Sequence, residues 1–524
     1  MKRIIAVILT VCMVLALGVT ASAAETKNIT ASYRDVTIVA DGTPIVPRDA
    51  SGKPVEPFIY NGTTYLPVRA VADALGVSVA WDEATSTITL TRGGEPTAAA
   101  GQAMTSYADK AITATYRDIK LVVDGKTIVP KDANGNTVDP FIYNGTTYLP
   151  VRAVADALGV AVEWDADTYT VYLGERIEWA VSKEESTYDG YKTTSTYTYD
   201  KQGNLTGAKY VDNDGTDTTA YTYDAAGNCT SEKYSDSNGY TYTYTYTFDA
   251  AGNQTSEKYS DSYGSAYTYT YTYDAAGNRI RETYQEDSWD FTVDYNYNAQ
   301  NQLVSVKTSY ADGTSYLEKY TYDAAGNLTE QVNTGSDGFT STTRYTYNAR
   351  GDMLTIRYSD SDGWTYTTEY TYDAAGRMTR YSNRDSEYGD TLETYVYDAA
   401  GNCLENTYSN TCDGVTWSYS YKYTYDAGNR LIREVGTETD GTVTTTEYTY
   451  DAEGRPVTVS ETSGGTTTTY AITYDLGNNI IRVVSTAPGV SNEMKFEYDK
   501  HGNMILEDYG LGNITRTEYI AIKK

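Results

Sequence analysis

The chain has 524 residues, a formal net charge of -30, and 56 tyrosines beside 6 phenylalanines and 6 tryptophans. This excess of negative charge argues against nucleic acid or another anionic surface as a partner, unless cations intervene. With 4 cysteines and 1 histidine, the chain is too poor in both to form a disulfide framework or a typical zinc centre. Tyrosine and threonine favour strands. We therefore expect a mainly β protein with no cofactor.

Residues 1–23 have the order of a secretory signal peptide, with basic, apolar and small residues in turn. Lys2 and Arg3 precede an apolar run from Ile4 to Val19, and a small-residue site allows cleavage after Ala23. A membrane anchor is the alternative. However, the run is shorter than the ~20 residues that span a bilayer, and no later segment is long and apolar enough. We expect a secreted bacterial protein, extracellular or associated with the cell wall, with no transmembrane segment after cleavage.

A tandem duplication follows, because residues 58–77 return letter for letter at residues 141–160. Within each copy an Asn-Gly dipeptide, first at Asn61 and Gly62, predicts a tight β-hairpin. An alanine-rich segment then has the apolar face of a short helix, which Gly76 can end. Two further strands are expected around the Trp-Asp pair after it. Each copy is thus predicted to be one short helix against a small antiparallel sheet.

Eight positions of this pattern recur in both copies: Asn61, Gly62, Pro67, Arg69, Leu75, Gly76, Trp81 and Asp82, and then Asn144, Gly145, Pro150, Arg152, Leu158, Gly159, Trp164 and Asp165. The two segments resemble the copper amine oxidase N-terminal domain-like, or stalk, domain, which the resemblance places at residues 29–92 and 112–174. A linker rich in Gly, Pro and Ala occupies residues 93–111. What the family implies is a noncatalytic appendage.

The sequence argues against amine oxidation. In the family that chemistry needs a copper site of three histidines and a quinone derived from a tyrosine in an Asn-Tyr-Asp/Glu motif. This chain has His501 alone, at a predicted turn, and Asn296-Tyr297-Asn298 is a partial echo at a regular repeat position. Zinc and copper sites usually need several His or Cys ligands. No metal site or catalytic residue is predicted.

A second repeat system begins near residue 176, marked by an aromatic-Asp step. The step recurs every 24 or 25 residues, with one spacing of 28, at Tyr199, Tyr223, Phe248, Tyr273, Tyr297, Tyr322, Tyr347, Tyr372, Tyr397, Tyr425, Tyr450, Tyr474 and Tyr498, where Asn replaces Asp after Tyr297 and Tyr347. Asp followed three residues later by Gly is typical of a type I β-turn, with the Asp side chain accepting backbone hydrogen bonds. The predicted structural turn pairs include Asp224 and Gly227, Asp274 and Gly277, Asp323 and Gly326, and Asp373 and Gly376.

A second turn signal lies midway between these steps, as at Asp312-Gly313 and Asp362-Gly363. About eight residues of alternating pattern join the two turns, most clearly in YTYTYTYTF at residues 240–248. Each repeat is therefore predicted to be a β-hairpin with tyrosines on one face and mostly threonines on the other. Single hairpins would be unstable, so we expect stability to come from many repeats acting together.

The repeat Tyr320, Tyr322, Asp323, Gly326, Asn327, Leu328 and Thr329 shows the consensus. It resembles the Rhs or YD repeat family, whose members wind strips of hairpins into a β-shell that, in toxins, encloses a toxic C-terminal segment. Other members act in adhesion and carbohydrate binding. The closing DPxGxxG core of the toxins is missing here, and the chain stops just past the last repeat. We expect residues 176–524 to form a long curled antiparallel sheet or partial β-shell that stays open.

Aromatic residues near the second turn could stack on sugar rings, although packing across strands explains them as well. The candidates for stacking are Tyr240, Trp289, Phe339, Trp364 and Trp417. Acidic turns could bind calcium weakly, but turn chemistry accounts for them already. Cys403 and Cys412 are close enough in sequence to bridge one hairpin, which spacing alone cannot decide.

The leading functional hypothesis is a secreted or cell-surface scaffold without catalytic activity. It would bind cell-wall or other carbohydrate, or mediate adhesion, through the repeat sheet. The alternative, from a different class, is a cargo-less Rhs-type component of a toxin-delivery or intercellular competition system, whose effector lies in another chain. Enzymatic activity is not expected, because the repeated Asp residues are equivalent turn positions and none forms a distinct catalytic pair.

Overall fold

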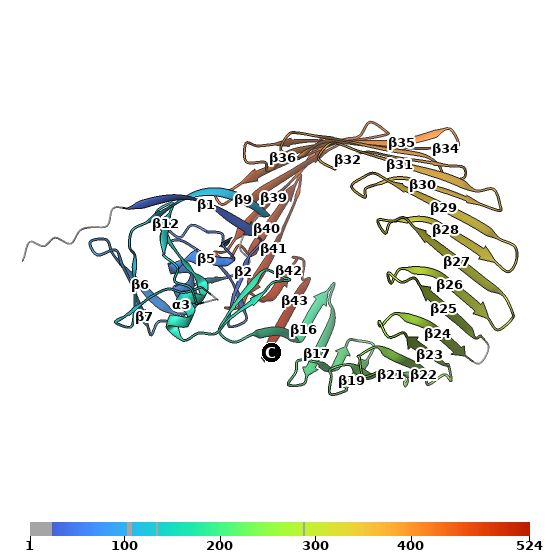
Figure 1. The fold of residues 1–524 in the computed structure, drawn as a ribbon, viewed down its shortest axis with the longest axis horizontal. Helices are drawn as coiled ribbons and strands as arrows, with labels where there is room; N and C mark the ends of the chain where they lie inside the picture. The colour runs from blue at the N-terminus through green and yellow to red at the C-terminus, as the bar shows by residue number, and fades with distance from the viewer. Residues whose placement is uncertain (1–23, 102–106, 133–134, 287–288, 524) are drawn as a thin grey trace, which may run out of the picture.

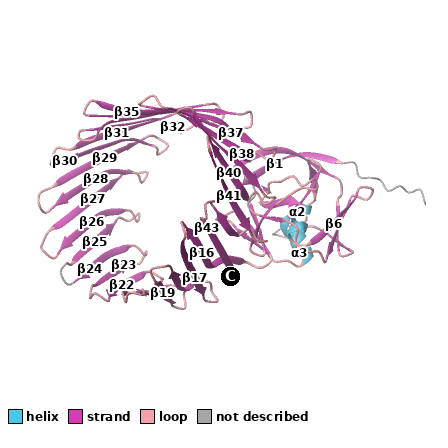
Figure 2. Ribbon diagram, turned by 180° about the vertical axis from the view of Figure 1, so that it is seen from behind, coloured by secondary structure: helices cyan, strands magenta, loops and turns pink. Residues whose placement is uncertain are grey.

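The computed structural model describes residues 24–523 apart from 102–106, 133–134 and 287–288, so the predicted signal peptide lies outside the described residues. A large ring of strands dominates the molecule, and a smaller N-terminal unit with two helices lies against one side of it (Figure 1). Figure 2 shows the same arrangement from behind. We call residues 24–175 the N-terminal unit and residues 177–523 the ring.

The N-terminal unit contains two copies of one set of elements. The first copy consists of β1 (Glu25–Arg34), β2 (Thr37–Ala40), β3 (Thr43–Val46), β4 (Phe58–Tyr60), β5 (Thr63–Pro67), α2 (Val68–Ala74), β6 (Val77–Asp82), β7 (Thr87–Arg92) and β8 (Ala99–Ala100). The second consists of β9 (Tyr107–Tyr116), β10 (Lys120–Val123), β11 (Lys126–Ile128), β12 (Phe141–Tyr143), β13 (Thr146–Pro150), α3 (Val151–Leu158), β14 (Val162–Asp165) and β15 (Thr170–Leu173). The predicted hairpins and helices are all present.

Positive backbone angles explain why the hairpin at Asn61-Gly62 is so tight. Asn61 has φ 48° and Gly62 has φ 72°, which is the left-handed geometry of a two-residue type I′ turn. β4 and β5 then pair directly, with Tyr60 opposite Thr63. The same geometry recurs in the second copy, so both hairpins enter their helices in the same way.

The two copies interlock instead of forming separate sheets. β1, β4 and β5 of the first copy close a small barrel with β13, β12 and β9 of the second. In addition, β7 runs parallel to β10, and β2 runs parallel to β15. The predicted antiparallel pairing therefore holds throughout the small barrel, whereas the other two sheets each contain one parallel pair that joins the two copies. Each of these sheets therefore needs strands from both copies.

The packed hydrophobic core also lies in this unit. One cluster gathers beneath both helices and includes Leu66, Leu90, Leu121 and Leu149, each fully buried. A second fills the small barrel, where Phe58 and Phe141 lie with ring centroids 6.3 Å apart. Burial of such side chains is worth about 1.5–3 kcal/mol each. The N-terminal unit therefore contains a conventional hydrophobic core.

The ring is one antiparallel sheet, and consecutive strands pair along its whole length. Within the described residues it has 28 strands: β16 (Ile177–Tyr188), β17 (Tyr191–Tyr199), β18 (Leu205–Val211), β19 (Thr216–Tyr223), β20 (Cys229–Ser235), β21 (Thr241–Phe248), β22 (Gln254–Asp261), β23 (Ala266–Tyr273), β24 (Arg279–Glu286), β25 (Phe291–Tyr297), β26 (Leu303–Tyr310), β27 (Ser315–Tyr322), β28 (Leu328–Gly335), β29 (Thr340–Tyr347), β30 (Met353–Asp360), β31 (Thr365–Tyr372), β32 (Met378–Asp385), β33 (Gly389–Tyr397), β34 (Cys403–Cys412), β35 (Val415–Tyr425), β36 (Leu431–Glu438), β37 (Val443–Tyr450), β38 (Pro456–Ser463), β39 (Thr466–Tyr474), β40 (Ile480–Ala487), β41 (Val490–Tyr498), β42 (Met504–Asp508) and β43 (Ile514–Lys523).

The predicted mainly β architecture and curled antiparallel sheet are confirmed, but the expectation of an open sheet is wrong. β43 pairs with β16 from Ile177 opposite Lys523 to Thr187 opposite Ile514, with one irregularity between Val181 and Lys183. The last strand thus closes the ring on the first. The physical reason is that strand twist and curl bring the two ends together, and their pairing removes both free edges.

The three cysteines that the structure describes, Cys229, Cys403 and Cys412, are free, so no bridge joins Cys403 to Cys412. The two residues stand at opposite ends of β34, and an extended strand of this length keeps their Cα atoms far beyond the distance that a disulfide can span. Among the residues with assigned structure, no helix is long and apolar enough to cross a membrane.

The N-terminal unit docks onto the last three repeat turns of the ring. His501 stacks on Trp179 with ring centroids 4.2 Å apart, and its Nδ1 lies 2.7 Å from the Thr43 hydroxyl. Trp179 also donates its indole N–H to the Gly42 carbonyl at 3.0 Å. The Asn479 amide donates to the Ala100 carbonyl at 3.1 Å. The lone histidine therefore belongs to a structural interface beside the closing strands.

Gly477 is the tightest point of this interface, since a Cβ there would lie only 1.8 Å from the Ala100 carbonyl oxygen. We expect Gly477→Ala to separate the N-terminal unit from the ring, measured as a larger radius of gyration by small-angle scattering. Gly428→Ala is the matched control, because Gly428 holds the same turn position and its Cβ would meet only its own turn. An unchanged radius in both variants would show that the docking does not depend on this contact.

Candidate functional site

An aspartate holds most of the repeat turns, and Asn298 and Asn348 take its place in two of them. The Asp224 Oδ1 atom accepts hydrogen bonds from the backbone N–H groups of Ala226 and Asn228, both at 2.9 Å. Its Oδ2 accepts from the Asn228 side-chain amide at 3.0 Å. Gly227 has φ 88°, which a residue with a Cβ adopts only with strain. Asp274, Asp323 and Asp373 accept in the same way in their own turns.

The tyrosine before the aspartate links neighbouring hairpins. Tyr223 donates its hydroxyl to the Leu205 carbonyl at 2.8 Å, Tyr322 to the Leu303 carbonyl at 2.8 Å, and Tyr372 to the Met353 carbonyl at 2.9 Å. Each acceptor is the first residue of the strand that follows the preceding turn. The tyrosine is thus a clamp between consecutive repeats, a role that the alternating pattern alone does not reveal.

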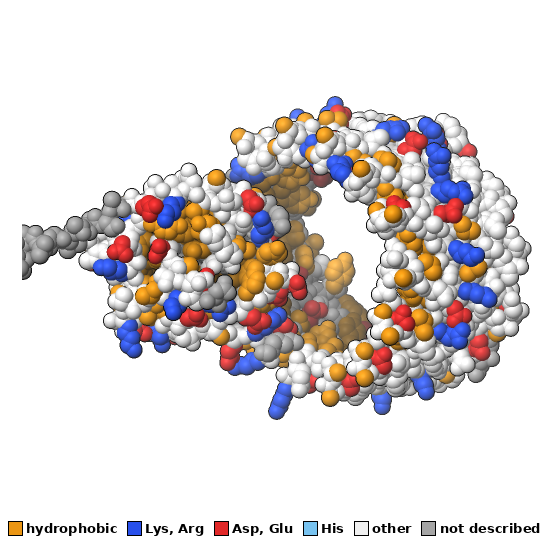
Figure 3. Space-filling model, viewed as in Figure 1, with side chains coloured by type: hydrophobic (Ala, Val, Ile, Leu, Met, Phe, Trp, Pro, Cys, Tyr) orange, Lys and Arg blue, Asp and Glu red, His pale blue; other side chains and the backbone are white. Residues whose placement is uncertain are grey.

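Register separates the side chains of the ring into two faces. On β21 and β22, Tyr246 lies opposite Glu257 and Tyr244 opposite Tyr259, while Thr245 lies opposite Lys258 on the other face. On this hairpin the tyrosines and Glu257 therefore share one face, and Thr245 and Lys258 share the other. Figure 3 shows the hydrophobic colour, which includes tyrosine, along the inner wall, and Lys and Arg side chains on the visible outer surface. The tyrosine face is the inner wall.

Aromatic rings form a continuous row along part of the inner wall. Successive ring centroids from Tyr242 to Tyr259 and on to Tyr267 lie 6.1 and 5.0 Å apart. The row continues to Tyr284 at 5.6 Å and to Phe291 at 5.1 Å. Such pairs stabilise by about 0.5–1.5 kcal/mol each beyond their buried area. In a ring with almost no buried aliphatic core, this row supplies the packing.

Carboxylates are set among these tyrosines. They include Glu232, Glu257 and Glu282 at one position of three successive repeats, and Glu318, Glu393 and Glu434 farther along. The sequence signal for the first three is their regular spacing.

Hydrogen bonds to these carboxylates keep the neighbouring phenols protonated. Tyr242 donates to Glu232 at 2.8 Å, and Tyr395 donates to Glu393 at 2.6 Å. The bond to Glu393, together with burial, raises the pKa of Tyr395 to about 12. Burial, with the charge of Glu434 behind it, raises the pKa of Tyr423 to about 12. Neutral phenols that donate hydrogen bonds to neighbouring glutamates therefore line the wall.

The basic residues of the strands stand mostly on the opposite face. Lys258, Lys307 and Arg344 are exposed and lie opposite outward residues. Arg279 is the exception, because it points inward and pairs with Glu282 at 3.0 Å. Basic side chains of the strands are thus concentrated on the outer face of the sheet.

The structure scatters the five predicted stacking aromatics along one rim. Trp364 is half-buried and donates its indole N–H to Asp385 at 2.9 Å, and Tyr240 packs on Tyr263 at 5.1 Å. Phe339 is also half-buried. Trp289 and Trp417 are the most open, with 56% and 66% of their surface exposed. The five positions lie on separate repeats.

Two family models match the chain. The model of the copper amine oxidase N-terminal domain matches residues 49–173 and 131–199, and the model of the RHS repeat matches residues 199–238 and 297–340. The chain therefore contains a copper amine oxidase N-terminal domain and RHS repeats. Among curated proteins, none matches this chain.

Solved structures that resemble this chain are distant. TcdB2-TccC3 without its hypervariable C-terminal region aligns with 89% of this chain and 27% of its own, at 13% identity and a TM-score of 0.31. The Photorhabdus luminescens Tc holotoxin pore aligns with 91% of this chain and 31% of its own, at 12% identity and a TM-score of 0.22. This chain spans less than a third of either, and the assignment rests on the two family models.

The turn aspartates predict an acid-sensitive ring. The hydrogen bonds from Asn327 lower the pKa of Asp323, so its contribution to stability is present above the unfolded pKa of about 3.9 and is lost as the pH falls through the folded value. We expect Asp323→Ala to lower the urea midpoint at pH 7 and to change it less at pH 3.

Asp323→Asn is the matched control, because the chain already uses Asn298 at an equivalent turn, where its Oδ1 accepts the same two backbone bonds. At pH 7 we expect the urea midpoint of this variant to lie closer to that of the unmodified protein than the midpoint of Asp323→Ala does. Equal midpoints for all three proteins at pH 7 would show that the aspartate does not hold the turn.

Proposed function

We propose that this protein is a noncatalytic shell component of a secreted toxin-delivery or intercellular competition system, and that its ring holds an effector polypeptide from another chain. The observation that carries the proposal is the closed ring of RHS repeats with an open centre (Figure 3). Closure removes the free sheet edges, which would otherwise pair with any extended chain. What remains available to a guest is the inner wall.

The chemistry of that wall favours a basic polypeptide. Carboxylates such as Glu232 and Glu257 attract Lys and Arg side chains, and tyrosine faces can hold cations by cation–π contact. Phenols and carboxylates also offer hydrogen-bond partners to an unfolded backbone. Few aliphatic side chains line the wall, so a guest polypeptide would be bound mainly by polar contacts and would bury little apolar surface. Such binding is reversible, which would allow the guest to be released.

Binding of labelled oligolysine, followed by fluorescence anisotropy and by protection from protease, tests this proposal. We expect a triple Glu232→Gln, Glu257→Gln, Glu282→Gln variant to weaken binding about tenfold or more, since it removes adjacent inner charges. A triple Glu369→Gln, Glu447→Gln, Glu497→Gln variant changes the net charge equally on the outer face and should bind nearly normally. An equal loss in both variants would mean that only overall charge matters.

Adhesion to carbohydrate through the sheet is a second proposal, supported by the exposure of Trp289 and Trp417. Each indole face could stack on a sugar ring. We expect intrinsic tryptophan fluorescence to change on titration with isolated cell walls, and Trp289→Ala with Trp417→Ala to remove that change. A flat response of the unmodified protein would reject carbohydrate binding at these positions.

A further inference from the structure

Two equivalent cavities lie in the N-terminal unit, one in each copy. The first encloses about 280 Å³ and the second about 330 Å³. Small-ligand sites in proteins begin near this size. Each cavity is built from both copies, because the helix and strands of one copy form one side and the Asn-Gly hairpin of the other copy forms the opposite side. The interlocking of the copies therefore creates both cavities.

The two cavities share three kinds of lining. Trp81 and Trp164 are 39% and 37% exposed, so each offers part of an indole face. Two threonines face each cavity from the partner copy's hairpin, Thr146 and Thr147 in the first and Thr63 and Thr64 in the second. Apolar side chains such as Val68 and Val151 complete the walls.

An arginine without an ion-pair partner also lines each cavity. Arg69 and Arg152, at the starts of α2 and α3, make no hydrogen bond or ion pair with any residue that the structure describes. Asp73 interacts electrostatically with Arg69, but it forms no ion pair with it. In a chain of net charge -30, two guanidinium groups free for an incoming carboxylate stand out.

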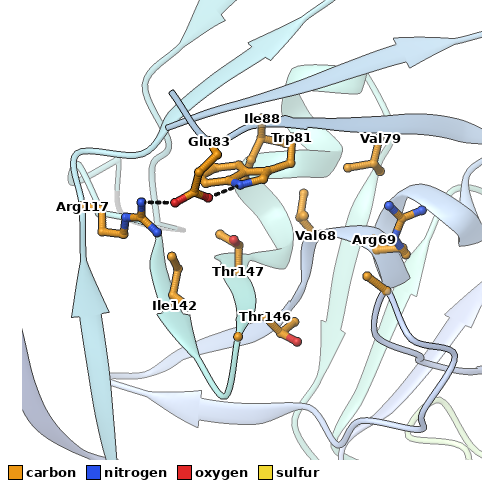
Figure 4. A pocket seen from close by; sticks show the side chains of 12 residues that line it. Val68, Arg69, Val79, Trp81, Glu83, Ile88, Arg117, Ile142, Thr146 and Thr147 are labelled. Atoms are coloured by element: carbon orange, nitrogen blue, oxygen red, sulfur yellow. Dashed lines mark hydrogen bonds and ion pairs between the residues drawn. The ribbon is translucent and has the colours of Figure 1, made fainter. Parts of the chain in front are cut away.

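The first cavity has a fixed aromatic wall. Trp81 donates its indole N–H to Glu83 at 2.7 Å, and the same carboxylate pairs with Arg117. Figure 4 shows this chain of contacts facing Thr146 and Thr147, with Arg69 on another side. In the second cavity Trp164 instead packs edge-on against Tyr169, with centroids 5.9 Å apart. The indole is held in both cavities, although by different contacts.

We propose that both cavities bind a sugar residue that carries one carboxylate. The indole stacks on the C–H face of the sugar ring, the threonine hydroxyls bond its hydroxyls as donors and acceptors, and the arginine binds the carboxylate through a two-pronged hydrogen bond. A neutral sugar leaves the arginine unpaired. A continuous polyanion is repelled by the protein's net charge, so isolated carboxylates in a mostly neutral glycan fit best.

Calorimetric titration of the full chain tests this site with two matched disaccharides. One joins N-acetylglucosamine to N-acetylmuramic acid, and the other is chitobiose, which lacks the lactyl carboxylate. We expect two sites for the first disaccharide and at least tenfold weaker binding of the second, because a charge-assisted hydrogen bond is lost. Equal binding of both disaccharides, or binding of neither, overturns the proposal.

Substitution of the two cavity arginines tests where the disaccharide binds. Arg69→Gln and Arg152→Gln should each reduce the stoichiometry from two sites to one, and the double variant should abolish binding. Arg344→Gln, on the outer face of the ring, is the matched control and should keep both sites. Retention of two sites in the double variant, with a normal circular dichroism spectrum, would show that these cavities are not where the sugar binds. The test is independent of the ring's cargo.

Discussion

The pairing of β43 with β16 is the constraint on which the ring depends. Among the described ring residues, Val293 and Ile522 are the buried hydrophobic side chains, so no central core holds the sheet in shape. A strip of hairpins is stabilised by contacts between neighbours, and an open strip would expose two strand edges. Closing the strip gives both edge strands a hydrogen-bonding partner and fixes the curvature of the sheet. Every repeat then has a neighbour on each side.

The N-terminal unit reinforces that closure from outside. It contacts the last repeat turns, where residues depart from the commonest turn sequence: His501 takes the place of an alanine, and Gly477 does so as well. His501 stacks on Trp179, and Gly477 leaves room for the Ala100 carbonyl. A single small unit with an ordinary hydrophobic core thus covers the region where the ends of the coreless ring meet, and the two parts complement each other physically.

Local chemistry made much of this architecture predictable. Asn61-Gly62 dictates its hairpin because only a few residue types accept two consecutive left-handed angles, and the spacing of Tyr223, Asp224 and Gly227 dictates a turn because each residue acts within that turn. The inner row of Glu232, Glu257 and Glu282 was also present as a period in the sequence. The position of these glutamates inside the ring depended on which face of the sheet is concave. The alternation of residues along a strand separates the two faces but does not show which one is concave.

The sequence by itself determined the β-hairpin unit, the number and period of its repeats and the duplication near the N-terminus, because all of these follow from contacts between residues close in the chain. The tertiary structure alone decided that the sheet closes, that the two N-terminal copies exchange strands and that the arginines and threonines of different copies meet in shared cavities. Those features depend on accumulated strand twist and on packing between segments far apart in sequence, and no local pattern encodes either one.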